Sequence, residues 1–422
     1  MKGNSRLRRL ARFGSVAVLA LLLAACAGQY PNTTFEPHSD LGRAIDFLWD
    51  RLLLLGTIVF VLVEAALLFV VFRYRRRPGN DVKPPQTHGN ALLEVIWTLI
   101  PAFVLLFIAV PTVRTTFNTQ AKVAAGALEI EVIGHQWWWE FRYPEFGITT
   151  ANEIYLPTGR TVNFKLTSVD VIHSFWAPQL GGKRDVMANR TNYIWLTPDS
   201  TLQPSVWNGF CAEYCGASHA RMRFRVFTVK PDQFASWVAG QQRPGIVGSA
   251  PVSPGAGAPP AGASPASVTG AATATMASNG APGYTFPQNV PEFDYARPNG
   301  AIPDGLTFTK GLTGNAGRGQ RVYSSAACIG CHAIAGNPMS VGVVGPNLTH
   351  FGSRSTIGAG SFPNTPAYLA LWIKNSRAMK PGVLMPTLGK NEYDPHLKTR
   401  VTTGGLDDQQ IADIVAYLMV LK

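Results

Sequence analysis

CAEYCGASHARM, residues 211–222, is the stretch that says most about this 422-residue chain. It places Cys211, Cys215, His219 and Met222 within twelve residues. Thiolate, imidazole and thioether groups are soft-to-borderline ligands, and together they are the set expected for copper in electron transfer. The stretch therefore predicts a copper site built largely on one loop.

A second histidine, His173, lies upstream between two expected strands and can complete the ligand set. Because Cys211 and Cys215 are four residues apart, both thiolates can bridge a pair of metal ions, and the carbonyl oxygen of Glu213 lies between them. A disulfide is the alternative, since an oxidising compartment would favour one. A disulfide alone leaves the nearby histidine and methionine unexplained, so a copper pair is the preferred interpretation.

Alternating apolar and polar residues predict strands in segments 128–132, 162–166 and 221–227, with Gly, Pro and Asp between them. Short alternating strands of this kind predict a small antiparallel sandwich or barrel that carries the copper loop. Residues 231–238 have the pattern of a short amphipathic helix, which we expect to close the domain.

Two apolar segments, residues 52–72 and 92–110, are each long enough to cross a hydrocarbon core of about 30 Å. The residues between them, 73–90, hold five basic residues and one acid. Basic loops stay on the cytoplasmic side, so the N-terminus and everything after residue 111 are expected outside. A buried helix hairpin of a globular protein is the alternative, and the tight arginine cluster argues against it.

Residues 1–25 predict an export signal, because a basic start precedes an apolar stretch too short to span a bilayer. The small residues before Cys26 resemble a lipoprotein signal, after which Cys26 would be an acylated N-terminus. An ordinary signal peptide is the alternative. The net charge of +12 is concentrated in this leader and in residues 73–90. It therefore indicates membrane topology, and no nucleic-acid partner is expected.

Residues 328–332 read CIGCH, which fits covalent attachment of a c-type haem. Cys328 and Cys331 have the spacing that reaches both vinyl groups, and His332 is placed to ligate the iron. A zinc half-site is the alternative, but no second cysteine pair follows. A haem that only transfers electrons needs a second axial ligand, and methionine raises its potential. The candidates after the motif are Met339, Met379, Met385 and Met419.

Residues 211–222 closely resemble the dinuclear copper loop of cytochrome c oxidase subunit II, and residues 170–176 are similar to that family's first ligand histidine and its flanks. The resemblance implies an all-β, cupredoxin-like Greek-key barrel that holds two copper ions. It also implies that the side chain of Glu213 helps to hold a magnesium ion shared with subunit I. The implied copper ligands are His173, Cys211, Cys215, His219, Met222 and the carbonyl oxygen of Glu213.

Three further segments resemble known families. Residues 134–139, GHQWWW, are similar to the aromatic segment of subunit II, which implies that Trp137 is the first acceptor of electrons. The other two tryptophans are expected to pack. Residues 94–101 look like the start of the family's second membrane helix, where Glu94 would lie near a proton-uptake entrance. Residues 380–386 resemble the methionine loop of class I cytochromes c, which favours Met385 as the axial ligand, with Met379 as the second choice.

The chain is thus expected to be multidomain. A signal peptide (1–25) precedes an N-terminal segment with a two-helix transmembrane hairpin (26–115), and a cupredoxin domain follows (120–240). An all-α cytochrome c domain (300–422) comes last. Residues 241–290 are rich in Ala, Gly, Pro and Ser with almost no charge, which predicts a flexible linker. This is the organisation of caa-type oxidases.

The resemblance implies subunit II of a haem-copper oxidase in a bacterial inner membrane, with the copper and haem domains on the periplasmic face. Electrons from a cytochrome c or the cytochrome bc complex would pass through haem c and the copper pair to haem a of subunit I. Oxygen reduction coupled to proton pumping would occur there, with subunit III and the bilayer as further partners. No catalytic residue is expected in this chain, since its membrane segments lack the histidines of an oxygen-reducing centre.

Other functions use related parts. A nitric oxide reductase could use the same copper pair in its electron-accepting subunit, whereas a nitrous oxide reductase needs a large His-rich domain that this sequence lacks. A membrane-anchored copper-delivery protein binds one copper and has no need of His219, Met222 or a haem. A quinol oxidase subunit II shares the anchor and barrel but not the metal ligands.

Overall fold

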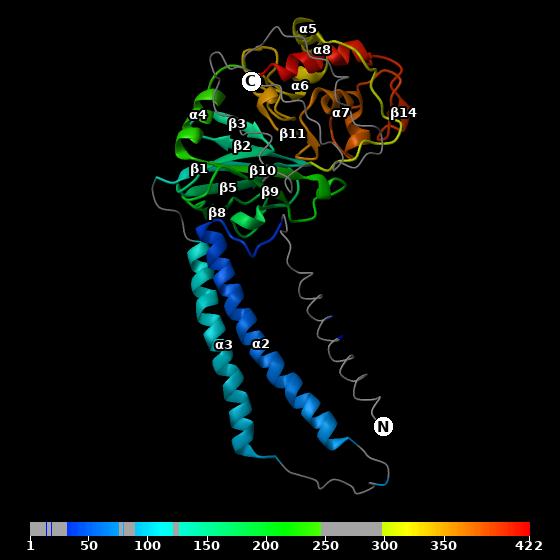
Figure 1. Cartoon of the computed structure of the whole chain (residues 1–422). Helices are drawn as coiled ribbons and strands as arrows, with labels where there is room; N and C mark the ends of the chain where they lie inside the picture. Colours follow the sequence, from blue (N-terminus) through cyan, green and yellow to red (C-terminus); the bar gives the residue numbers. More distant parts are fainter. Residues whose placement is uncertain are drawn as a thin grey trace.

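A computed structural model describes residues 32–75, 89–120, 126–245 and 298–422, together with the single positions 14, 18 and 79. We call residues 126–245 the β-domain and residues 298–422 the C-terminal domain. Two long helices extend from one side of the β-domain, and the C-terminal domain lies on its opposite side (Figure 1). The predicted signal, Cys26 and most of the predicted linker lie outside the described residues.

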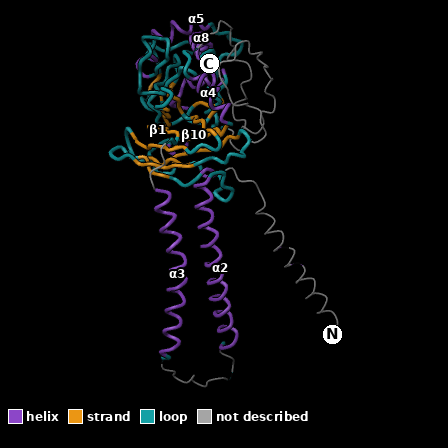
Figure 2. The backbone as a smooth tube through the Cα atoms, turned by 90° about the vertical axis from the view of Figure 1, so that its left-hand side faces the viewer, coloured by secondary structure: helices purple, strands orange, loops and turns teal. Residues whose placement is uncertain are grey.

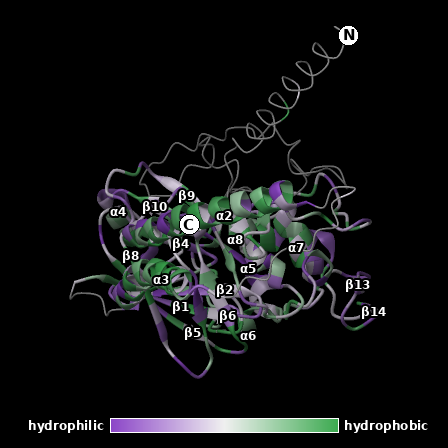
Figure 3. Ribbon diagram, turned by 90° about the horizontal axis from the view of Figure 1, so that it is seen from below, coloured by the Kyte–Doolittle hydropathy of each residue, from purple (hydrophilic) through white to green (hydrophobic). Residues whose placement is uncertain are grey.

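The two helices, α2 (Asp40–Tyr74) and α3 (Ala91–Gln120), are each long and apolar enough to cross a membrane. They run side by side in Figure 2, and Figure 3 shows them coloured mainly as hydrophobic. The predicted pair of spans is confirmed, but both helices are longer than 52–72 and 92–110. The apolar pattern marks only the part that faces lipid, and the helical backbone continues through polar turns toward the β-domain.

The first turn of α2 is built into the β-domain. Ser39 precedes the helix, and its hydroxyl donates to the carbonyl of Leu180 at 2.6 Å. Asp40 accepts a hydrogen bond from the backbone N–H of Thr197 at 2.7 Å. Leu41 is buried within the core of the β-domain. These contacts fix where the membrane anchor meets the outer domain.

The β-domain consists of two five-stranded sheets. The first has the order β3 (Ile148–Ala151), β2 (Trp138–Tyr143), β1 (Leu128–His135), β5 (Val162–Ser168) and β8 (Asn192–Leu196). The second has the order β4 (Glu153–Pro157), β10 (Arg223–Val229), β9 (Ser205–Cys211), β6 (His173–Trp176) and β7 (Arg184–Val186).

The expectation that all strands would be antiparallel is wrong. Strands β1 and β5 pair in parallel, and so do β4 and β10. Alternation of apolar and polar residues reports which face of a strand is buried, not the direction of the neighbouring strand. The predicted all-β, cupredoxin-like character of this part of the chain holds.

Aromatic rings fill the space between the sheets. Trp139, Phe141 and Tyr143 alternate along β2 and are all fully buried. The rings of Phe175 and Phe224 stack with centroids 4.7 Å apart and meet the β2 aromatics edge to face. Helix α4 (Pro231–Gln241) covers one end of the domain, as the sequence predicts for residues 231–238.

The main regular elements of the C-terminal domain are helices, joined by long loops. Two short hairpins also occur, which the all-α prediction did not include, and two-residue strands of this kind have no clear sequence pattern. The helices are α5 (Ala316–Ser325), α6 (Cys328–Cys331), α7 (Pro366–Met379) and α8 (Asp408–Met419). The hairpins are β11 (Thr356–Ile357) with β12 (Phe362–Pro363), and β13 (Tyr393–Asp394) with β14 (Thr399–Arg400). Short 3-10 turns in the chain are η1 (Pro178–Leu180), η2 (His219–Arg221) and η5 (Phe351–Ser353).

Helices α5 and α8 cross in close backbone contact. A side-chain carbon at Gly319 would lie 1.9 Å from the carbonyl oxygen of Asp413, so only glycine fits there. Arg318 binds the Asp413 carboxylate through two hydrogen bonds of 2.7 and 2.8 Å. Burial opposes ionisation of Asp413, but the hydrogen bonds from Arg318 and neighbouring groups outweigh it and lower the pKa of Asp413. The apolar face predicted for the last helix is buried against this crossing: Ile411, Ile414, Val415 and Leu418.

We expect Gly319→Ala to destabilise the C-terminal domain by roughly 2–3 kcal/mol, because the helices must separate to admit the methyl group. Gly317→Ala is the matched control on the same helix. Its nearest neighbouring atom would lie 3.4 Å away, so it should be neutral or stabilise by up to about 1 kcal/mol. Chemical denaturation of the full-length protein in detergent measures both. Equal midpoints for the two variants would contradict the close crossing.

Candidate metal centres

The loop of residues 212–221 is held at the end of the second sheet by the pairing of β9 with β10. Cys211 is the last residue of β9, and Met222 directly precedes β10. The backbone N–H of Cys211 donates to the carbonyl of Met222 at 2.9 Å, which closes the loop at its base. The two sequence ends of the motif are therefore neighbours in space.

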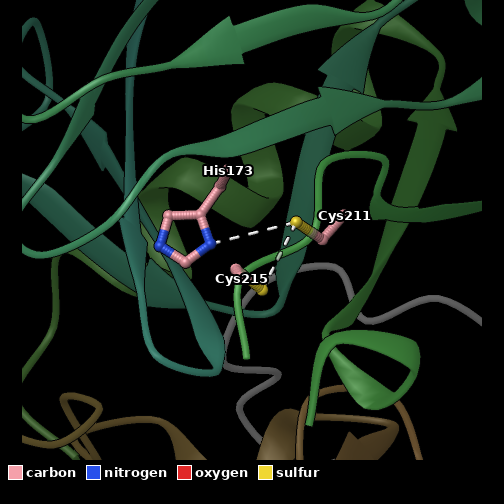
Figure 4. Close-up of side chains that lie close together, drawn as sticks. All are labelled: His173, Cys211 and Cys215. Carbon is pink, nitrogen blue, oxygen red and sulfur yellow. Dashed lines mark hydrogen bonds between the residues drawn. The ribbon is translucent and has the colours of Figure 1, made fainter. Parts of the chain in front are cut away.

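Five of the predicted copper ligands converge, four of them buried and the fifth, His219, half-buried. The sulfur atoms of Cys211 and Cys215 lie 3.7 Å apart. The Nδ1 atom of His173 lies 3.9 Å from the sulfur of Cys211 (Figure 4). On the other side, the sulfur of Cys215 lies 3.6 Å from Nδ1 of His219 and 3.7 Å from the sulfur of Met222. The cysteines are free thiols, so the disulfide alternative is not supported.

Glu213 offers the sixth predicted ligand through its backbone. Its carbonyl oxygen lies 3.1 Å from the sulfur of Cys211. The side chains of Glu213 and of Tyr214 are exposed, so the carboxylate is free to meet a partner subunit. The backbone and the side chain of this residue thus face two different environments.

His173 reaches the site from β6, which pairs with the end of β9. Its Nε2 atom hydrogen-bonds to Asp170 at 2.8 Å, and this contact turns Nδ1 toward the cysteines. The ring lies against Gly134, where a side-chain carbon would come within 2.6 Å. Burial opposes protonation, but the contacts with Asp170 and Cys211 outweigh it and raise the pKa of His173. Second partners of this kind orient metal-binding histidines.

The two thiols compete for one negative charge. A hydrogen bond from Cys215 is the largest factor that lowers the pKa of Cys211 to about 4. The same interaction, together with burial, raises the pKa of Cys215. A cation between the sulfurs would allow both thiols to ionise, since metal binding favours the thiolate. The donor types, their burial and this shared proton all fit a soft metal ion.

The CIGCH motif forms a single helical turn, α6, followed by His332. The Nδ1 atom of His332 lies 2.8 Å from the carbonyl oxygen of Pro346. A carbonyl can only accept, so Nδ1 carries the hydrogen and Nε2 keeps a free lone pair. Burial lowers the pKa of His332, which also favours the neutral ring. The ring is therefore prepared to bind iron through Nε2, and Gly345 packs against it.

The methionines of the C-terminal domain occupy different environments. Met379 is fully buried, and Met339 is 55% exposed. Met385 is half-buried and packs against the same apolar core as Cys328. Its carbonyl accepts a hydrogen bond from the hydroxyl of Ser376 at 2.9 Å, which fixes the loop.

Trp137 lies between the copper loop and the C-terminal domain. Its indole N–H donates to the carbonyl of Cys215 at 2.9 Å. The edge of its ring faces Gly382, where a side-chain carbon would lie 2.7 Å from the ring. Of the two tryptophans that follow, Trp138 stacks on His135 and Trp139 is in the core.

Three residues around these sites carry contacts that the sequence reasoning did not assign. They are Asp170 on His173, Gln136 on the carbonyl of Cys215 at 2.7 Å, and Lys380 on the carbonyl of Trp137 at 2.6 Å. All three lie inside or beside the motifs. Their position in the sequence next to a predicted site residue could have marked them as supporting residues. No local pattern predicts the partner of any of them.

Glu94 is not near either centre. It is exposed in the first turn of α3, at the end of that helix away from the β-domain (Figure 1). Cys26, the predicted lipidation site, lies outside the described residues.

Three family models match the chain in order. The transmembrane domain of cytochrome c oxidase subunit II matches residues 36–115, and the periplasmic domain of the same subunit matches residues 147–229. The cytochrome c family matches residues 316–422. The matched ranges correspond to the two long helices, the β-domain and the C-terminal domain.

Individual proteins are also similar to this chain. Cytochrome c oxidase subunit 2 of Alkalihalophilus pseudofirmus is 32% identical over 97% of this chain and 97% of its own length. Quinol oxidase subunit 2 of Bacillus cereus is 31% identical, over 54% of this chain and 79% of its own length. The crystal structure of the periplasmic domain of subunit II of the Bradyrhizobium japonicum cytochrome oxidase is 28% identical, covering 29% of this chain and 97% of that structure, with a TM-score of 0.27.

The β-domain carries a converging set of sulfur and imidazole donors, and the C-terminal domain carries a haem-attachment motif with an oriented histidine. A cytochrome c oxidase subunit 2 is matched nearly from end to end. The chain therefore belongs to the cytochrome c oxidase subunit II family, as an oxidoreductase component of the oxidase with a C-terminal cytochrome c domain.

Proposed function

We propose that this subunit relays electrons from an external donor, through haem c in the C-terminal domain and a copper pair in the β-domain, to haem a of subunit I. Oxygen is reduced to water there, with proton pumping. The observation that carries the proposal is the convergence of five sulfur and imidazole donors beside Trp137, which also contacts the C-terminal domain. The family membership implies copper and haem c in these two domains.

Both cysteines and both histidines would hold the copper pair. When bound, the pair would supply one-electron transfer between the haem and haem a. The chain supplies a buried, rigid frame: strand β6 brings His173, and Asp170 fixes the ring. The other proposed ligands are Cys211, Cys215, His219, Met222 and the carbonyl oxygen of Glu213.

The haem would be attached through Cys328 and Cys331, with His332 and Met385 as axial ligands. The hydrogen bond to Pro346 supports the role of His332, because it leaves Nε2 for the iron. For Met385, the support is its half-buried position on the core that also contacts Cys328. Met379 is the second choice, and its side chain is enclosed in that core.

Trp137 is the proposed first acceptor of electrons from the haem. Its hydrogen bond to the carbonyl of Cys215 supports this role, since it joins the indole to a proposed ligand through one hydrogen bond and the few covalent bonds of Cys215. The contact of its ring with Gly382 extends that path into the C-terminal domain.

The remaining assignments concern partners and location. We propose that the exposed side chain of Glu213 helps to hold a magnesium ion at the boundary with subunit I, and that Glu94 lies near a proton-uptake path. Subunit III and the bilayer complete the complex, and a cytochrome c or the cytochrome bc complex is the donor. Both outer domains would face the periplasm of a bacterial inner membrane, after a cleaved signal and with Cys26 lipidated.

Two other functions use the same residues less completely. A copper-delivery protein needs neither Met222 nor a haem motif. A nitric oxide reductase with a copper-containing subunit would share the electron path but act on a different substrate in its partner subunit. The number of copper ions per chain distinguishes the copper-delivery protein from the proposed oxidase subunit. The substrate that the purified complex reduces distinguishes the nitric oxide reductase from it.

Metal analysis of the full-length protein tests the proposal. We expect two copper ions and one covalent haem per chain, and Met222→Leu should weaken copper binding while preserving the fold, because leucine conserves the buried volume. Met187→Leu, at a half-buried site in the same domain, is the control and should keep both coppers. One copper per wild-type chain, or haem lost on denaturing extraction, would contradict the proposal.

The axial ligand can be tested by comparing two methionine variants. Met385→Leu should lower the reduction potential of the haem and change its absorption spectrum, because the thioether is lost from the iron. Met379→Leu should leave both properties near those of the wild type, since a volume-conserving change in the core costs less than about 1.5 kcal/mol. The reverse pattern would assign the iron to Met379.

A further inference from the structure

The C-terminal domain contacts the β-domain at several places, among them His350 on the carbonyl of Gln241 and Asn299 on Arg223. Two segments carry the contacts that lie nearest to Trp137. One is the β11–β12 hairpin with the residue before it, residues 355–363, which we call the docking hairpin. The other is the loop of residues 379–382 that leads to Met385. Both segments meet the β-domain near the proposed electron path, and neither belongs to the metal ligands.

Glu153 is the center of the first contact. It begins the edge strand β4, and only 3% of its surface is exposed. One oxygen of its carboxylate accepts from the backbone N–H of Ser355 at 2.9 Å and from that of Thr356 at 2.8 Å. The same oxygen accepts from the hydroxyls of both residues, at 3.0 Å for Thr356. Burying a carboxylate is costly unless hydrogen-bond donors satisfy it. Glu153 can therefore be buried here only because the docking hairpin supplies those donors.

Arginines on the neighbouring strand β10 contact the tip of the docking hairpin. The guanidinium of Arg225 is buried and donates to the carbonyl of Gly360 at 3.2 Å. The backbone N–H of Arg223 donates to the carbonyl of Ala359 at 3.2 Å. Ala359 and Gly360 both have positive φ angles, 59° and 73°. This left-handed turn presents its carbonyl oxygens to the cationic strand.

The second segment meets Trp137 directly. The guanidinium of Arg221 donates to the carbonyl of Met379 at 2.6 Å. The buried ammonium of Lys380 donates to the carbonyl of Trp137 at 2.6 Å. Gly382, at a φ of 82°, packs on the indole ring where no larger residue would fit. Loop 379–382 therefore contacts Trp137 through a backbone hydrogen bond and an edge of the ring.

We propose that Glu153 anchors a docking site for the chain's own C-terminal domain, and that seating the docking hairpin on Glu153 holds Gly382 against Trp137. Glu153 acts through that contact and is a positioning residue. The C-terminal domain is the partner that fits this site. The β-domain offers the Glu153 carboxylate to the N–H and hydroxyl groups of the docking hairpin, and it offers arginines to the carbonyl groups of that hairpin. Its importance for electron transfer rests on the proposed function.

One consequence concerns the external donor. In the seated arrangement, Gly382 occupies one edge of the Trp137 ring, and the tryptophan is only partly exposed. We therefore expect electrons from a separate donor protein to enter through the C-terminal domain. Loss of the anchor should slow the internal step and leave reduction of the haem by an external donor unchanged.

The test uses the assembled, full-length oxidase and compares Glu153→Ala with Glu145→Ala. Glu145 lies in the same domain, but its side chain is 50% exposed, and within the described part of the chain its ion-pair partner is Arg160. After flash reduction of the haem, we expect transfer to the copper pair to be about tenfold slower or more in Glu153→Ala, since several buried hydrogen bonds to a charged group are lost. Glu145→Ala should match the wild type.

Two further variants separate docking from folding. Glu153→Gln keeps an acceptor oxygen and should restore the rate to within about threefold of the wild type. Ser355→Ala combined with Thr356→Val removes the hydroxyl donors from the other side and should slow transfer without altering the β-domain. If Glu153→Ala does not bind copper, the transfer rate of this double variant alone tests the anchor: a wild-type rate would contradict it.

A pulsed electron-spin measurement of the distance between haem iron and copper pair supplies a readout independent of rate. We expect the distribution to broaden in Glu153→Ala and to stay narrow in Glu145→Ala. Unchanged rate and distance in a variant with native copper and haem spectra would overturn the anchor. A wild-type protein without two coppers or covalent haem would instead overturn the proposed function.

Discussion

Two buried sulfur atoms that lie 3.7 Å apart are the constraint on which the rest of the outer structure depends: Cys211 ends β9, and Cys215 lies in the loop that the pairing of β9 with β10 closes at its base. Such a pair is costly to bury as two thiolates, because two negative charges this close disfavour each other: the hydrogen bond between them lowers the pKa of Cys211 and raises that of Cys215. The surrounding framework limits how these sulfurs can move. Asp170 turns one histidine toward them, and the indole of Trp137 holds the carbonyl of Cys215.

The same framework places the three parts of the chain in series. The first turn of α2 belongs to the β-domain core through Leu41, so the membrane anchor is rigidly joined to the copper loop's scaffold. The C-terminal domain occupies the opposite side (Figure 2), where its loops contact Trp137 and Glu153. Hydrogen bonds at both junctions fix these separations, as the proposed electron transfer would require.

Much of the fold followed from local patterns. Two apolar spans, the final helix and the short closing helix were predictable because hydrophobic periodicity repeats within each segment. The parallel pairing of β1 with β5 was not, because alternation does not encode the neighbour of a strand. The outer turns of α2 and α3 were also missed, since polar turns that continue a membrane helix carry no hydropathy signal.

The sequence by itself determined the kinds of ligand and their local order. Cys211, Cys215, His219 and Met222 lie within one loop, and CIGCH lies within one turn, so spacing alone indicates their chemistry. Only the tertiary structure decided which residues support them. Glu153 and Thr356 are 203 residues apart, and Lys380 and Trp137 are 243 apart. No periodicity links such positions, because their contact exists only once two separately folded domains pack together.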